Sequence, residues 1–235
     1  MPRDATDTRR KLLDAAAMSF AEHGVRNASL VEITRRAGQR NSGALHYHFG
    51  SREGVLCAVL DEHVEFIAHR QSELLARALE QPGDDVAPVL EAVVRPAAEL
   101  AESSWQGRCW LLILADVIEE GPATFGPELN QVLDRTGGNP SYDVLRERLP
   151  DMPPEVEVER LSLMTMFILR AVADRARMTS VDTDADGAPG TAPAPRGRPQ
   201  LPYEAFVQNL VAMAAAAMAS PDRAASAAGE RPAAR

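Results

Sequence analysis

The most constraining feature of this sequence is the helical spacing of its apolar residues. Leu12, Leu13, Ala16, Ala17 and Phe20 share one helical face, and no stretch alternates long enough to indicate a strand. The pattern predicts an all-α fold. Helices are expected over residues 8–23, 30–36, 41–48, 52–79, 84–102, 104–119, 125–136, 141–148, 154–177 and 202–219.

Charge is distributed unevenly along the 235 residues. Residues 1–50 carry eight basic and five acidic side chains, or +3, although the whole chain has a net charge of −9. Such asymmetry is typical of a protein that presents one end to nucleic acid. Two cysteines, no apolar N-terminal run and no apolar stretch near 20 residues predict a cytoplasmic protein without signal peptide or membrane span.

Residues 24–48 predict a helix-turn-helix. Gly24 ends the first helix, and Ser29 with Glu32 three positions later is the pattern of a capping box. A glycine-containing turn follows, and Asn41 or Ser42 offers a new N-cap. The helix predicted at 41–48 has almost no apolar residue besides Leu45, so it buries little and presents its surface.

Residues 8–56 resemble the N-terminal DNA-binding domain of the TetR family of transcriptional regulators. The residues that carry the resemblance are Thr8-Arg9, Leu13-Asp14-Ala15-Ala16, Phe20-Ala21-Glu22-His23-Gly24, Ser29-Leu30, Ile33, Ala37-Gly38, Leu45, Tyr47-His48-Phe49 and Ser51-Arg52-Glu53. The family usually has one residue fewer between Gly38 and Gly43, so a longer turn is expected here. The rest of the chain is similar in architecture to the family's ligand-binding and dimerisation domain.

This resemblance implies a division of the chain into two domains. A three-helix DNA-binding domain is expected at 5–52 and a larger helical effector-binding and dimerisation domain at 53–219. Within the second, residues 179–201 lack periodicity and predict a flexible loop. The Ala/Pro-rich residues 220–235 predict a disordered tail.

The resemblance also implies which residues meet DNA, because the third helix would lie in the major groove. The residues expected to contact DNA are Ser29, Arg40, Asn41, Ser42, Gly43, Ala44, His46, Tyr47, His48 and Arg52. Arg52 opens the next helix, whose positive N-terminal end also favours a phosphate. Two alternatives stay open: an ordinary polar surface helix, and a Tyr47 that belongs partly to the core.

Bulky and adaptable side chains in the C-terminal part suit an apolar effector pocket. The candidates are Phe66, Trp105, Cys109, Trp110, Leu114, Met164 and Phe167. Simple core packing explains the same residues equally well.

The segment 154–177 is apolar nearly all round, so it needs cover on several sides. Together with the Ala- and Met-rich 202–219 it resembles the family's dimer interface, a four-helix bundle. The residues expected there are Leu161, Met164, Ile168, Val172, Leu210 and Met213. Burial within one subunit is the alternative.

No catalytic, cofactor or phosphate-loop motif occurs in the sequence, so an enzyme is not expected. Asp61, Glu65 and His69 share a helical face and suggest half of a metal site, but a solvated face explains them more simply. The sequence thus predicts a homodimeric, effector-responsive repressor that binds a palindromic DNA operator. A helical protein-interaction module without operator binding is the alternative.

Overall fold

The structure, a computed structural model, describes residues 2–41, 43–81, 83–183 and 199–220. Within these ranges all regular secondary structure is helical, which confirms the all-α prediction. The elements are α1 (Pro2–His23), α2 (Leu30–Arg36), α3 (Ala44–Phe49), α4 (Arg52–Asp61), α5 (Val64–Leu79), α6 (Ala87–Ser103), α7 (Trp105–Glu120), η1 (Pro122–Thr124), α8 (Pro127–Asp134), α9 (Gly138–Arg148), α10 (Pro154–Thr183) and α11 (Tyr203–Met218).

The helices α1, α2 and α3 form the N-terminal unit around a small apolar core. Phe20, Ile33 and Leu45, one from each helix, are at most 3% exposed. Ser29 caps α2 by accepting a hydrogen bond from the Glu32 backbone N–H (3.3 Å). The reciprocal half of the predicted capping box is absent, because the Glu32 carboxylate binds the Arg35 guanidinium instead (2.8 Å).

The helix predicted over 52–79 is wrong at its centre, where α4 ends at Asp61 and α5 begins at Val64. In a continuous helix the Leu60 carbonyl would accept from the backbone N–H of Val64. Here it accepts a hydrogen bond from the indole Nε1 of Trp110 on α7 (2.6 Å). The break is therefore associated with a tertiary contact, and no proline or glycine occurs between residues 55 and 79.

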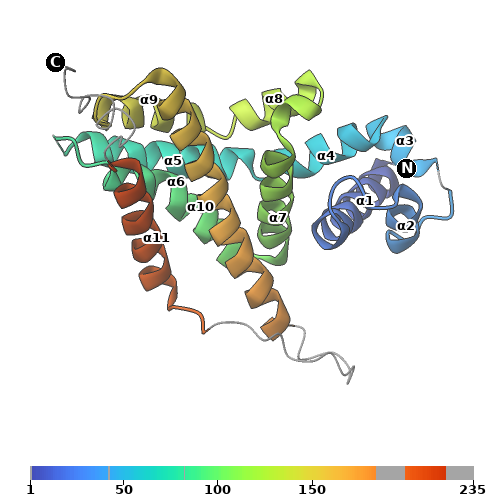
Figure 1. Ribbon diagram of the computed structural model, residues 1–235. Helices are drawn as coiled ribbons and strands as arrows, with labels where there is room; N and C mark the ends of the chain where they lie inside the picture. Colours follow the sequence, from blue (N-terminus) through green and yellow to red (C-terminus); the bar gives the residue numbers. More distant parts are fainter. Residues whose placement is uncertain (1, 42, 82, 184–198, 221–235) are drawn as a thin grey trace, which may run out of the picture.

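The helix α7 lies between the N-terminal unit and the rest of the molecule. It packs against α1 on one side and against α6 and α10 on the other. Figure 1 shows the N-terminal unit at one end, with α4 leading from it toward the larger body that α5 to α11 form. The helix α7 is therefore in direct contact with both parts of the molecule.

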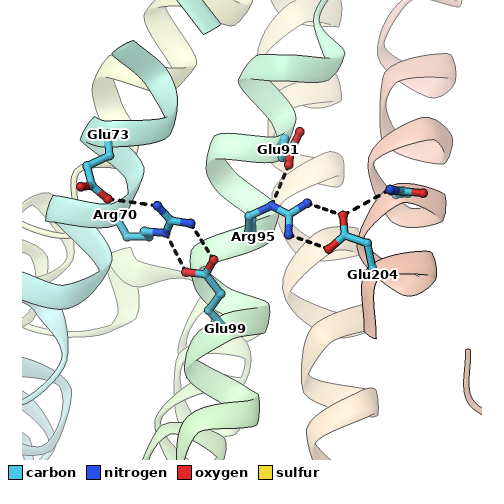
Figure 2. A network of polar contacts seen from close by, with 7 residues as sticks. Arg70, Glu73, Glu91, Arg95, Glu99 and Glu204 are labelled. Carbon is cyan, nitrogen blue, oxygen red and sulfur yellow. Dashed lines mark hydrogen bonds and ion pairs between the residues drawn. The ribbon is translucent and has the colours of Figure 1, made fainter. Parts of the chain in front are cut away.

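Two arginine-centred networks join the helices of the body at its surface (Figure 2). Arg70 of α5 binds both carboxylate oxygens of Glu99 on α6 (2.8 and 2.9 Å). Arg95 of α6 binds both oxygens of Glu204 on α11 (2.7 and 2.9 Å). The Arg95 guanidinium lowers the pKa of the Glu204 carboxyl below its ordinary value. Paired Arg–carboxylate contacts of this kind fix orientation as well as distance.

The helix α10 is longer than predicted and continues to Thr183. The expectation of a loop from residue 179 is therefore wrong for 179–183, while most of that loop, 184–198, lies outside the described residues. The predicted tail lies outside them as well from residue 221 onward. No described helix combines the length and the apolar character needed to cross a membrane.

Candidate DNA-binding surface and ligand cavity

The short helix α3 presents most of its surface to solvent. Leu45 anchors it and is 3% exposed, whereas Tyr47 is 84% exposed and therefore does not belong to the core. His46 is exposed beside Tyr47, and Ala44 and His48 are half-buried. A helix anchored in this way keeps its remaining side chains available to a partner.

The turn before α3 is held by its own polar groups. The Asn41 side-chain oxygen accepts a hydrogen bond from the Gly43 backbone N–H (2.9 Å), and α3 begins one residue later. Arg40, Asn41 and Gly43 are exposed, while Ser42 lies outside the described residues. The exposed turn thus continues the surface of α3.

Carboxylates neutralise most of the positive charge of the N-terminal unit. Arg36 binds Glu22 (2.7 and 2.9 Å) and lowers the pKa of that carboxyl. Among the described residues, the exposed Arg9 and Arg40 form no ion pair with a carboxylate. These two unpaired charges are the ones best placed to meet an anion.

Arg9 was not among the residues expected from the sequence. Its guanidinium lies over the Phe49 ring, 5.1 Å from the ring centre, and so stands beside the C-terminal end of α3. The sequence contains no signal for this neighbourhood, because α1 and α3 meet only through tertiary packing. Arg9 extends the exposed surface of α3 with a positive charge.

Arg52 makes contacts inside the protein. Its guanidinium donates from one nitrogen to the Val25 carbonyl (2.9 Å) and the Ala28 carbonyl (2.6 Å), both in the loop between α1 and α2. These bonds hold α4 against the loop that precedes α2. The structure therefore gives Arg52 a structural role beside the phosphate contact expected from the sequence. Ser29, in the same loop, is exposed and serves as the α2 cap.

The N-terminal unit is fastened to α7 by polar contacts. The Asp116 carboxylate accepts a hydrogen bond from the Val25 backbone N–H (2.9 Å). Arg26 forms an ion pair with Glu120 one turn further along α7. Gly24, with φ 81°, brings the chain so close that a Cβ there would lie 3.3 Å from Asp116 Oδ2. These contacts bind the loop after α1 to the body.

A cavity of about 250 Å³ lies in the body on the other side of α7. Apolar side chains from α5, α6, α7, α8 and α10 form most of its wall: Ile67, Val93, Ala97, Trp110, Leu114, Ile118, Leu133, Ile168 and Leu169. Polar groups are contributed by Gln71, Asn130, Asp134, Thr136, Asn139, Tyr142 and Thr165, with Gly138 completing the lining. An apolar cavity with a few polar groups is the usual form of a small-molecule site.

Trp110 and Leu114 are the two residues of the predicted pocket that line this cavity. Phe66 and Phe167 are 42% and 37% exposed and lie outside it. The half-buried Trp105, Cys109 and Met164 pack against the core without lining the cavity.

Helix periodicity explains why Trp110 and Leu114 line this cavity while Cys109 does not. Trp110, Leu114 and Ile118 lie on the face that meets the cavity, whereas Cys109 shares a face with Asp116 seven residues later, toward the N-terminal unit. Burial raises the pKa of the Cys109 thiol to about 11. Its thiol is thus kept neutral at physiological pH.

Most of the predicted dimer residues lie in the protein's own core. Leu161, Ile168, Val172 and Leu210 are at most 6% exposed, so the alternative of burial within one subunit holds for them. Met164 is half-buried. The sequence of an all-round apolar helix does not disclose which side its own subunit covers.

The exposed apolar face of α10 and α11 is made by other residues. Leu163, Met166 and Phe167 on α10 are 54%, 37% and 37% exposed, and Met213 on α11 is 50% exposed. Phe167 and Met213 border the same surface groove. Met213 is thus the predicted interface residue that reaches this face.

The side chains considered for a metal do not converge. Asp61 pairs with Arg135, Glu65 is exposed, and His69 stands near Glu73. Over the described ranges no group of three or more His, Cys, Asp or Glu side chains could hold a metal ion.

Comparison with known proteins matches the N-terminal unit and the beginning of the body. Residues 12–59 match the family model for bacterial regulatory proteins, tetR family. The A-factor receptor protein of Streptomyces griseus is 35% identical over 83 residues, which cover 35% of this chain and 30% of the relative. The transcriptional repressor KstR2 of Rhodococcus jostii (strain RHA1) is 33% identical over 109 residues, or 44% and 50%. The chain thus spans half or less of these two curated relatives.

Solved structures extend the likeness to the whole fold. The ketosteroid transcriptional regulator KstR2 of Mycobacterium tuberculosis has a TM-score of 0.55 at 19% identity, over 91% of this chain and 95% of its own. The fatty acid degradation regulator FadR of Bacillus halodurans has a TM-score of 0.50 at 17% identity, over 88% and 94%. At these identities the likeness shows the fold alone, an N-terminal helix-turn-helix with a larger helical body. Residues 12–59 are thus similar to the N-terminal domain of the tetR family of bacterial regulatory proteins.

Proposed function

We propose that the protein is a sequence-specific DNA-binding transcriptional regulator, and that α3 reads the major groove. The observation that carries this proposal is the exposure of His46 and Tyr47 on α3, with the unpaired cation Arg9 near the C-terminal end of this helix and Arg40 in the turn before it. Positive groups near a reading helix supply the phosphate contacts that position it. The half-buried Ala44 and His48, together with the exposed Asn41 and Gly43, complete the proposed contact surface.

The proposed regulator works as a homodimer on a palindromic operator. The exposed apolar face of α10 and α11 supports this, because large side chains at the surface of two adjacent helices are typical of an interaction site. Two-fold symmetry would place two copies of α3 on half-sites roughly 34–36 Å apart.

Its regulation would couple the cavity to α3 through α7. Trp110, Leu114 and Ile118 face the cavity, and Asp116 on the same helix holds the loop after α1. A small molecule that binds better to the DNA-free arrangement would move α7 and release the operator. The reciprocal must also hold: DNA weakens effector binding by the same factor. A repressor that is relieved by its effector is the form we propose.

The domain division at residues 52 and 53 and a cytoplasmic location are part of the same proposal. The start of α4 at Arg52 supports the boundary. The two curated relatives described above, a receptor protein and a transcriptional repressor, support a non-enzymatic role. The effector domain would then comprise residues 53–219.

The test is selection and sequencing of genomic DNA fragments bound by the purified chain near physiological salt. An enriched palindrome whose affinity falls steeply with salt is the expected result. Substituting Tyr47→Ala should weaken binding, while Val31→Ala, an exposed apolar position on α2, serves as the control. A folded chain that enriches no sequence would contradict the proposal and favour a protein-interaction module.

A further inference from the structure

The cavity beside α7 contains polar groups but no cation. Among the described residues that line it, Asp134 is the one charged side chain, and no Lys, Arg or His takes part. Asp134 and Asn139 are exposed, so they lie toward solvent, whereas Gln71 is 7% exposed. An anionic ligand would meet the Asp134 carboxylate and no compensating positive charge among these lining residues.

The hydroxyl groups that line the cavity already donate their hydrogens to acceptors within the protein. Thr165 donates to the Leu161 carbonyl (2.8 Å), so the 2.5 Å contact between Thr165 and Tyr142 requires Tyr142 to be the donor. Thr136 donates to the Leu133 carbonyl (2.7 Å). The three hydroxyl oxygens therefore offer only lone pairs to anything in the cavity.

Gln71 adds an unsatisfied acceptor. Its Oε1 is buried and has no hydrogen-bond partner within the described part of the chain, although buried polar atoms nearly always have one. The Trp110 indole N–H, the donor on the apolar side, is committed to Leu60. The amides of Gln71, Asn130 and Asn139 can donate as well as accept, but the remaining polar groups can only accept.

We propose that this cavity binds a small, mainly apolar molecule that carries an O–H or N–H donor and no negative charge. The donor bonds to acceptors among Gln71, Tyr142 and Thr165, while the apolar part packs against Trp110 and Leu114. The volume of about 250 Å³ corresponds to roughly eight waters at ~30 Å³ each, the scale of a small molecule of one or two rings. The assignment of this ligand as an effector rests on the proposed function, whereas its binding to the cavity does not depend on that function.

Three two-ring probes of similar size separate the possibilities by isothermal titration calorimetry on the full chain. The first, 1-naphthol, has a donor; 1-methoxynaphthalene lacks it; 1-naphthoate is anionic. We expect 1-naphthol to bind about tenfold more tightly than either of the others, as the loss of one buried hydrogen bond predicts. Equal binding of the two neutral probes, tighter binding of 1-naphthoate, or no binding of 1-naphthol would overturn the inference.

Substitutions test whether the probe binds in this cavity. Gln71→Leu removes the unsatisfied acceptor and should bring the affinities for 1-naphthol and 1-methoxynaphthalene together. Gln131→Leu makes the same change at an exposed position of α8 outside the lining and should leave the tenfold ratio intact. Should Gln71→Leu fail to fold, as seen by circular dichroism, Tyr142→Phe is used instead. An unchanged ratio in the folded lining variant would contradict the inference.

The effector role of the ligand is tested separately, by measuring how 1-naphthol changes binding to the DNA site obtained by selection. Release of DNA by 1-naphthol supports both the ligand class and the effector role. Binding of 1-naphthol without any change in DNA affinity supports the ligand class and contradicts the effector role. A chain that binds no specific DNA but still prefers 1-naphthol overturns the regulator and leaves the ligand class standing.

Discussion

The indole Nε1 of Trp110 donates a 2.6 Å hydrogen bond to the carbonyl oxygen of Leu60. Trp110 belongs to α7 and also lines the cavity, while Leu60 is in the last turn of α4, which leads from the N-terminal unit. This bond thus joins a residue that lines the cavity directly to the helix that leads to the proposed DNA-binding surface.

Replacing Trp110 by Phe should lower the free energy of unfolding by about 1–3 kcal/mol, because the variant lacks the donor for a buried carbonyl. Trp105→Phe, at a half-buried position on the same helix, is the control for loss of an indole. Urea denaturation measures both. Equal losses in the two variants would show that the Leu60 bond contributes nothing particular.

Asp116→Ala should destabilise the protein by about 1–3 kcal/mol, since the Val25 backbone N–H loses its acceptor. Asp116→Asn keeps a side-chain oxygen at that position and should restore most of the loss. The exposed Glu119→Ala on the same helix controls for the change of charge. Thermal unfolding provides the comparison, and failure of the Asn variant to recover stability would contradict this account.

Arg52 and Arg40 should separate structural from DNA-binding roles. Arg52→Met leaves the Val25 and Ala28 carbonyls without their donor, so we expect a loss of about 1–3 kcal/mol in stability. Arg40→Met, at an exposed position, should change stability by less than about 0.5 kcal/mol. In DNA binding the Arg40 variant should instead reduce the salt slope by about one phosphate contact. Denaturation and salt titration of the operator complex measure the two effects, and a reversed pattern would refute the assignment.

The ion pair of Glu204 with Arg95 should make stability depend on acidity. The pKa of the Glu204 carboxyl is lowered in the folded state. The ion pair therefore stabilises the protein fully at pH values above the pKa of this carboxyl in the unfolded chain, about 4.3. That contribution is lost as the pH falls through the folded pKa. Wild type should therefore exceed Glu204→Gln in stability at pH 7 and lose this advantage toward pH 3. A difference that stays constant over this range in urea titrations would rule out the linkage.

The exposed apolar face of α10 and α11 should control dimerisation. Substituting Phe167→Asp places a charge among Leu163, Met166 and Met213 and should weaken self-association at least about tenfold, the cost of burying an unpaired charge. Leu79→Asp makes the same change at a 57% exposed leucine on α5 and should leave the dimer intact. Sedimentation velocity distinguishes the two. A dimer that survives the Phe167 substitution must use another surface.

Local periodicity and capping residues were enough to predict the all-α fold and the helix-turn-helix, because these depend on neighbours within a few positions of one another. Gly24 ends α1 and Ser29 caps α2 as the sequence predicts. The exposure of α3 also follows from its composition, because the helix predicted at 41–48 has almost no apolar residue besides Leu45.

Tertiary structure alone decided which face of each apolar helix is covered. Leu161 and Phe167 are equally apolar in sequence, but one packs into its own subunit and the other faces solvent. The break between α4 and α5 is likewise associated with Trp110, whose indole N–H donates to the Leu60 carbonyl fifty residues earlier in the chain. Distant contacts of this kind arise from packing geometry, which periodicity within one helix does not encode.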